Sequence, residues 1–157
     1  MRKTIIKPGS ENSSSSSQSW LDLERLTEVE ITSENAAHPI ESALVPGRGP
    51  GWRAAQPGEQ TIRIIFDQPL SLRRIRLRFS EAEQARTQEF DLRWLPAGQE
   101  TSREIVRQQY TFSPPGTTQE IEDYRVELKE VTALELKIVP DISGGSAYAS
   151  LAEIGLA

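Results

Sequence analysis

The sequence predicts an all-β protein built as an antiparallel β-sandwich, and three observations support this. Apolar and polar residues alternate with a period of two in several short segments, which is typical of half-buried strands. Strand-breaking residues separate these segments. Only one stretch has helical character, so the pattern indicates a sandwich rather than a mixed fold. The alternating segments are 61–66, 72–79, 90–94, 124–128, 134–138 and 151–156.

The start of the chain differs in composition from the rest. The chain has 157 residues, which fits one domain with a sizeable core. Residues 10–19 are rich in serine and contain no apolar side chain. We therefore expect residues 1–18 to form a flexible arm and residues 19–157 to form the sandwich domain, with ordered structure beginning at Trp20.

The first two alternating segments show clearly which face points inward. The expected inward residues are Ile62, Ile64, Phe66, Ile75, Leu77 and Phe79. The expected outward residues of the second segment are Arg74, Arg76 and Arg78. We expect this arginine row to be solvated and matched by acids such as Glu89 and Asp91 on a neighbouring strand.

Turns and loops divide the remaining chain. Turn signals lie at 67–69, 96–98, 113–116 and 140–145, and one helical turn is expected over 39–44. The longest irregular stretches are 33–60, 80–88, 110–120 and 139–149. Loops on a rigid scaffold commonly carry binding residues. We therefore expect functional residues in these four stretches.

Composition narrows the class of partner. The net charge is −5, from 18 Lys and Arg against 23 Asp and Glu, which argues against nucleic acid because affinity for phosphate backbones comes from clustered cations. There is no cysteine, no apolar signal-peptide region at the start and no apolar run of about 20 residues. We expect a soluble, cytoplasmic protein that does not contact membranes.

Catalytic chemistry is hard to assemble from these residues. His38 is the single histidine, cysteine is absent, and no strand–turn–helix nucleophile motif is visible. The glycines at 47–51 lack the Lys-Ser/Thr of a phosphate-binding loop. The carboxylate pairs Glu81/Glu83 and Glu120/Glu122 are interpreted as solvated acids beside strand ends. We expect a protein that is not an enzyme.

The loops hold polar, planar and aromatic residues of the kind that bind sugars. Aromatic faces stack on sugar rings, while guanidinium, imidazole and carboxylate groups bridge hydroxyls. The candidate ligand-binding residues are Glu34, His38, Trp52, Arg53, Arg86, Gln88 and Tyr148, with Asn35 and Arg48 in the same loops.

Each candidate also has a structural alternative. Trp52 could be a core residue, and His38 could hydrogen-bond the helical turn that follows it. Arg53 could pair with Glu59 on the surface. Tyr148 follows the small residues 143–147 and could be either a stacking platform or a buried plug over the edge of the sandwich.

Several segments together resemble the discoidin domains, also called coagulation factor 5/8 type C domains. These segments are 31–34, 38–44, 51–54, 58–62, 72–77 and 148–154, and the likeness spans residues 20–157. The resemblance implies an eight-stranded, galactose-binding-like jelly roll with ligand loops at one end. It also implies sugar contacts from His38, Arg86 and Tyr148. The chain is similar to small bacterial carbohydrate-binding proteins made of this domain alone.

The resemblance also concerns calcium binding. Many such domains hold a structural calcium with an aspartate in the turn that corresponds to residues 43–47 and a glutamate in the last strand. Here the turn has no carboxylate, although Glu153 is present. Calcium prefers six to eight oxygen ligands. We therefore expect no cofactor and no tight calcium site.

Two functional hypotheses follow. The leading one is a non-catalytic carbohydrate-binding module that recognises a galactose-like sugar. The alternative is a protein–protein or DNA-repair scaffold module, because the resemblance extends to the N-terminal domain of a single-strand-break repair scaffold. The acidic charge and loop aromatics favour the sugar, while the absence of a visible export signal and of an attached glycosidase favours the alternative.

Overall fold

The structure is a computed structural model, and it describes residues 20–45, 47 and 49–157. The predicted arm, residues 1–18, lies outside the described residues. The described part contains eight strands and two short helices. They are α2 (Leu23–Leu26), β1 (Thr27–Ile31), α3 (Glu41–Leu44), β2 (Trp52–Pro57), β3 (Gln60–Ser80), β4 (Arg86–Pro96), β5 (Arg103–Phe112), β6 (Gln119–Val139), β7 (Tyr148–Leu151) and β8 (Glu153–Leu156).

Two long antiparallel strands organise the fold. β3 and β6 each have 21 residues and pair along both of their halves, with Ile62 opposite Leu136 and Leu77 opposite Glu122. Between the two halves the register shifts, near Ile65 to Leu70. The segments 61–66 and 72–79, expected to be separate strands, are therefore two halves of β3, and 124–128 and 134–138 are two halves of β6.

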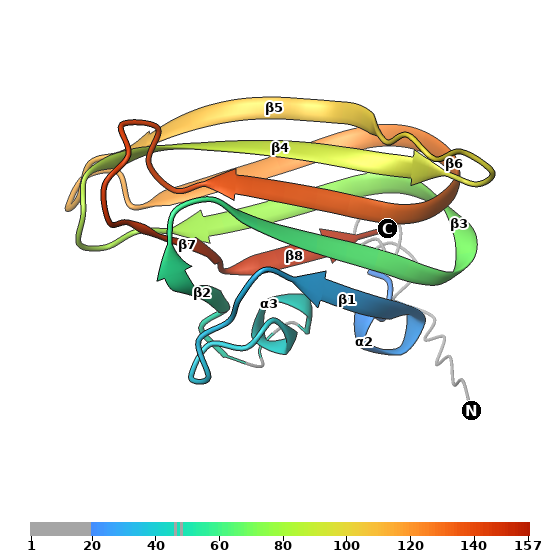
Figure 1. Cartoon of the computed structure of the whole chain (residues 1–157), viewed down its shortest axis with the longest axis horizontal. Helices are drawn as coiled ribbons and strands as arrows, with labels where there is room; N and C mark the ends of the chain where they lie inside the picture. Colours follow the sequence, from blue (N-terminus) through green and yellow to red (C-terminus); the bar gives the residue numbers. More distant parts are fainter. Residues whose placement is uncertain (1–19, 46, 48) are drawn as a thin grey trace, which may run out of the picture.

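Because β3 and β6 bend, each contributes to both layers of a sandwich (Figure 1). One layer contains β1, the first half of β3, the second half of β6, β4 and β5, in that order. The other contains β8 with the second half of β3 and the first half of β6. A separate two-stranded sheet of β2 and β7 lies at one end.

The predicted inward faces form the core between the layers. Phe79 of β3 and Phe90 of β4 stack across the layers with ring centroids 5.4 Å apart. Fully burying such a side chain contributes about 1.5–3 kcal/mol. The six predicted inward residues of β3 are all buried; they are Ile62, Ile64, Phe66, Ile75, Leu77 and Phe79. The antiparallel β-sandwich predicted from alternation is confirmed.

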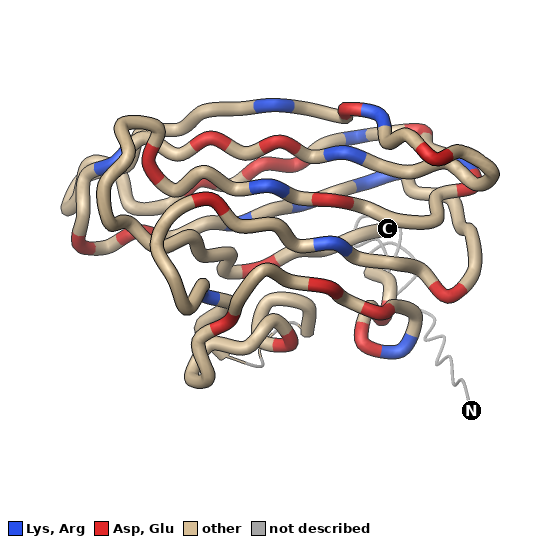
Figure 2. Tube along the Cα trace, in the orientation of Figure 1, with Lys and Arg blue, Asp and Glu red and all other residues tan. Residues whose placement is uncertain are grey.

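Basic and acidic residues are interspersed over the strands (Figure 2). The predicted pairing of the arginine row was wrong, because the neighbours of this half of β3 are β6 and β8. Arg74 pairs with Asp123 at 2.6 Å. Arg76 and Arg78 both face Glu153, at 3.4 and 3.6 Å.

Candidate ligand-binding site

Strands β2 and β7 lie at one end of the sandwich (Figure 1). A pocket opens there beside these strands. Its volume is about 150 Å³. It is lined by His38, Pro50, Trp52, Arg53, Ser80, Ser150 and Ala152. The first long loop, the end of β3 and strand β7 thus converge here, although they are far apart in the sequence.

The first loop is fixed to β2 by backbone hydrogen bonds. The Asn35 amide donates to the Arg53 carbonyl at 2.8 Å, and the Arg53 amide donates to the His38 carbonyl at 3.1 Å. The carboxylate of Glu34 accepts a hydrogen bond from the Ile40 amide at 3.1 Å, next to helix α3. Glu34 therefore orders the loop, while the backbone bonds place His38 beside Arg53 at the pocket.

Trp52 is a core residue, so its prediction as a ligand contact is corrected. Its side chain is 1% exposed, and its indole N–H donates to the Ser33 carbonyl at 3.1 Å. The neighbouring Gly51, at φ +103°, permits this close packing, because a Cβ there would lie 2.5 Å from the Leu151 carbonyl oxygen. Trp52 supports the floor of the pocket and leaves its aromatic face in the interior.

Tyr148 is partly exposed and lies next to Arg53. The tyrosine is 37% exposed, and the Arg53 guanidinium carbon lies 5.3 Å from its ring centroid. This is the geometry of a cation–π contact. Gly144 and Gly145, at φ +87° and +95°, let the preceding loop turn back towards β7. The plug alternative for Tyr148 does not fit this exposure. Arg53 thus contacts the Tyr148 ring instead of forming the alternative salt bridge with Glu59.

Arg86 and Gln88 are interior residues, which corrects their prediction as ligand contacts. Arg86 is 4% exposed and Gln88 is 0% exposed. They are the first and third residues of β4, and alternation places both on the inward face of that strand. The sequence predicts a loop at these positions, because the apolar alternation becomes visible only from Phe90.

Gln88 belongs to a buried polar cluster with Glu120. The Gln88 amide donates to Glu120 Oε1 at 3.2 Å, while no partner is found for Glu120 Oε2 among the described residues. Burial, together with the neighbouring Glu122 carboxyl, raises the pKa of Glu120 to about 9. Burial also raises the pKa of Tyr124 above its usual range. The interpretation of Glu120 as a solvated acid was wrong, because its side chain points into the sandwich.

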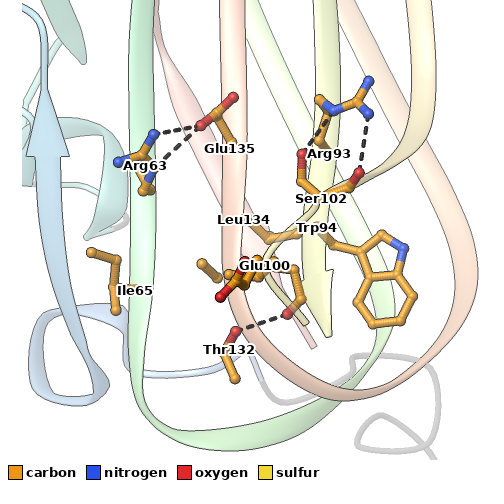
Figure 3. A pocket seen from close by; sticks show the side chains of 11 residues that line it. Arg63, Ile65, Arg93, Trp94, Glu100, Ser102, Thr132, Leu134 and Glu135 are labelled. Atoms are coloured by element: carbon orange, nitrogen blue, oxygen red, sulfur yellow. Dashed lines mark hydrogen bonds and ion pairs between the residues drawn. The ribbon is translucent and has the colours of Figure 1, made fainter. Parts of the chain in front are cut away.

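A second hollow lies on the outer face of the larger layer (Figure 3). It has a volume of about 360 Å³, and its polar groups already bind one another. Arg63 donates to Glu135 at 2.8 Å, and Arg93 donates to the Ser102 hydroxyl at 3.0 Å. A ligand would have to displace these pairs, so the end pocket is the better candidate.

The described residues contain neither a cluster of metal-binding side chains nor a membrane-spanning helix. Within residues 20–45, 47 and 49–157, no group of three or more His, Asp and Glu side chains is placed to hold a metal ion. Glu153 faces Arg76 and Arg78, and Pro46 of the divergent turn is outside the described residues. No helix in this part of the chain is long and apolar enough to cross a membrane.

Comparison with known proteins shows the fold through structure rather than sequence. No family model and no curated protein sequence matches the chain. A CBM32 module from Clostridium perfringens, solved in complex with GalNAc-β-1,3-galactose, has 17% identity and a TM-score of 0.62, covering 88% of this chain and 99% of its own. The F5/8 type C domain of a Bacteroides fragilis protein has 14% identity and a TM-score of 0.59, covering 88% and 94%.

A third structure of similar score has a different partner. Reduced XRCC1, solved bound to the DNA polymerase β catalytic domain, has 10% identity and a TM-score of 0.61, covering 85% of this chain and 96% of its own. The fold is therefore the galactose-binding-like sandwich of carbohydrate-binding modules and discoidin-like domains, as the sequence resemblance implied.

Proposed function

We propose that this protein is a non-catalytic carbohydrate-binding module that holds a sugar at the end pocket. The observation that carries the proposal is the contact between Arg53, which lines the pocket together with His38, and the partly exposed ring of Tyr148, which is not itself a lining residue. Tyr148 offers an aromatic surface for a pyranose face, and Arg53 and His38 offer donors and acceptors for its hydroxyls. The carbohydrate-binding modules that share the fold support this choice of ligand class.

The chemistry of the pocket suits binding better than hydrolysis. Its described lining contains one imidazole and one guanidinium but no carboxylate. Glycoside hydrolysis ordinarily requires two carboxyl groups flanking the scissile bond. Glu120 and Glu122, whose carboxyls lie close together, belong to the polar cluster around Gln88 and Gln108 and not to the pocket. A stacking contact contributes on the order of 1 kcal/mol, so we expect a single site to bind weakly, near millimolar.

The second candidate function is a protein-interaction module. It is favoured by the similarity to XRCC1, a structure solved with a protein partner. A glycan array at neutral pH separates the two candidates, because the carbohydrate proposal expects binding to at least one sugar class, including galactose-like sugars. Silence across the array would overturn that proposal and favour the protein-interaction module.

The array result should then be assigned to the pocket by mutation. Tyr148→Ala is expected to weaken binding of the selected sugar several-fold in calorimetry, because the stacking surface is lost. Ile142→Ala is the matched control, since Ile142 is 47% exposed in the loop that leads to Tyr148. Equal affinities of wild type and Tyr148→Ala would place the ligand elsewhere.

A further inference from the structure

The side chain of Arg86 is buried in the interior of the sandwich. Its side chain is 0% exposed, and its guanidinium carbon lies 4.8 Å from the ring centroid of Phe112, the last residue of β5. Burying a charge is costly unless it is paired and hydrogen-bonded. The groups that Arg86 binds therefore indicate which segments of the chain it holds in place.

Two of these partners come from different loops, and the third comes from β4. The Arg86 Nε donates to Glu81 at 2.7 Å, and Nη1 donates to the Pro140 carbonyl at 2.7 Å and to Gln88 at 3.3 Å. The other carboxylate oxygen of Glu81 accepts hydrogen bonds from the amides of Glu83 and Gln84, at 3.0 and 3.1 Å. One guanidinium thus fixes the loop after β3 and the start of the loop after β6.

Both loops lead directly to residues of the candidate site. Ser80, which precedes Glu81, lines the end pocket. Pro140 precedes the segment 141–147, and Tyr148 follows that segment. The same segment is held to the sheet at Ile142, whose amide donates to the Thr87 carbonyl at 2.9 Å, and at Ala147, whose carbonyl accepts from Gly58 at 3.1 Å. Through Glu81 and Pro140, Arg86 is therefore connected to the segments that lead to Ser80 and to Tyr148, without reaching the solvent.

We propose that Arg86 is a positioning residue, which sets the geometry of the ligand site by holding the loops that carry Ser80 and Tyr148. The ligand-facing guanidinium is that of Arg53, which lies over the Tyr148 ring. The expected effect of Arg86 on sugar affinity rests on the proposed carbohydrate function, whereas its expected effect on loop order does not.

The planar fork of arginine is needed for this arrangement. Arginine presents donors in a fixed geometry and can bind two acceptors in different directions at once. Lysine keeps the charge but donates from one nitrogen, so it cannot reproduce the two separate donors, Nε and Nη1, that the guanidinium directs at Glu81 and Pro140. Arg86→Lys therefore separates the fork from the charge.

The first measurement is hydrogen exchange of backbone amides in wild type, Arg86→Lys and a control, Arg107→Lys. Arg107 is an exposed arginine of β5. In Arg86→Lys, we expect protection in 141–147, including the Ile142 amide, to fall about 10-fold or more, because hydrogen bonds to charged groups are the stronger ones. The core amides of β3 and β6 should keep their protection. Unchanged exchange in 141–147, or a uniform loss across the core, would overturn the positioning role.

The second measurement is affinity for the sugar that the array selects. Arg86→Lys should weaken binding about 10-fold, while Arg107→Lys should leave it unchanged. Faster loop exchange with unaltered affinity would show that the loops are held but that this does not set the site. If wild type binds no sugar, the proposed function fails, and the exchange data still decide whether Arg86 holds the loops.

A second variant covers the case in which Arg86→Lys does not fold. Glu81→Gln leaves Arg86 in place but removes its carboxylate partner, which is partly exposed at 18% of its side chain. We expect faster exchange of the Glu83 and Gln84 amides and a smaller loss of affinity than in Arg86→Lys. Wild-type exchange of these amides in Glu81→Gln would contradict the proposal.

Discussion

Replacing Glu120 by glutamine should stabilise the protein at alkaline pH. Glu120 is 1% exposed, and its Oε1 accepts a hydrogen bond from Gln88. Its Oε2 has no partner among the described residues, and the Glu122 carboxyl lies beside it. Burial and the neighbouring Glu122 carboxyl raise the pKa of Glu120 to about 9, and the proton that Glu120 then carries can be donated from the otherwise unpartnered Oε2 to Glu122.

The sign of the pH dependence follows from linkage. The pKa of Glu120 is about 9 in the folded state against 4.5 for an unperturbed glutamate. Between these two values the folded state binds more protons than the unfolded state, so the free energy of unfolding falls as pH rises. At 1.36 kcal/mol per pKa unit, this one group lowers it by an amount on the order of 5 kcal/mol across the window. That is a large part of the 5–15 kcal/mol that is typical of domains.

Glu120→Gln removes this titration while preserving the hydrogen bonds. The amide carbonyl can still accept from Gln88, and the amide N–H can donate to Glu122 at every pH. Wild type and variant should have similar free energies of unfolding at pH 5. At pH 8.5 the variant should be more stable by a few kcal/mol, which corresponds to a rise in the melting midpoint of several degrees for a chain of this size.

The assay is urea unfolding at pH 5, 7 and 8.5, followed by tryptophan fluorescence, to which the buried Trp52 contributes along with Trp20 and Trp94. Glu127→Gln is the matched control, because Glu127 is exposed on the same strand and should not alter the pH dependence. If wild type and Glu120→Gln show the same change in unfolding free energy between pH 5 and 8.5, Glu120 is not protonated in the folded state. The explanation of the cluster would then be wrong.

Four further predictions concern the other regions of the chain. Tyr148→Ala should cost less than about 1 kcal/mol of stability because the ring is 37% exposed, whereas a buried plug would cost about 3 kcal/mol or more; thermal unfolding decides this. Trp52→Ala should cost about 3–5 kcal/mol in the same experiment, since the indole is 1% exposed; a near-neutral result would refute its role as core. Deleting residues 1–18 should leave the melting midpoint unmoved, and a clear drop would show that the arm docks on the sandwich. Calcium should raise the midpoint little, and a large rise that a chelator reverses would contradict this.

The sequence identified which residues are strands better than how the strands connect. Alternation marked both halves of β3, because the buried face of each half repeats every second residue. The sequence predicts a turn between two strands at Asp67, Gln68 and Pro69, which lie between the halves. The chain bends there instead and continues as one strand with shifted register, since β6 bends beside it. The pairing partner that allows the bend is far away in the sequence.

Elements with little alternation were not predicted. β5 was missed because several of its residues are polar and it packs at an edge, where Gln108 and Tyr110 contact polar groups of β6. β2 lay inside the stretch 33–60 that we expected to be a loop, and its pairing with β7 is a long-range feature. Short helix α2 begins at the Asp22 cap and has only four residues, too few for a periodic signal.

By itself, the sequence determined the fold class and the inward faces of the strands. These properties follow from local periodicity. Only the tertiary structure decided which of the polar and aromatic candidate residues face solvent. Trp52, Arg86 and Gln88 are buried, whereas Tyr148 and Arg53 meet at the surface. The physical reason is that a side chain's exposure depends on the partners that cover it, and for Arg86 these are Glu81, Phe112 and Pro140, which only folding brings together.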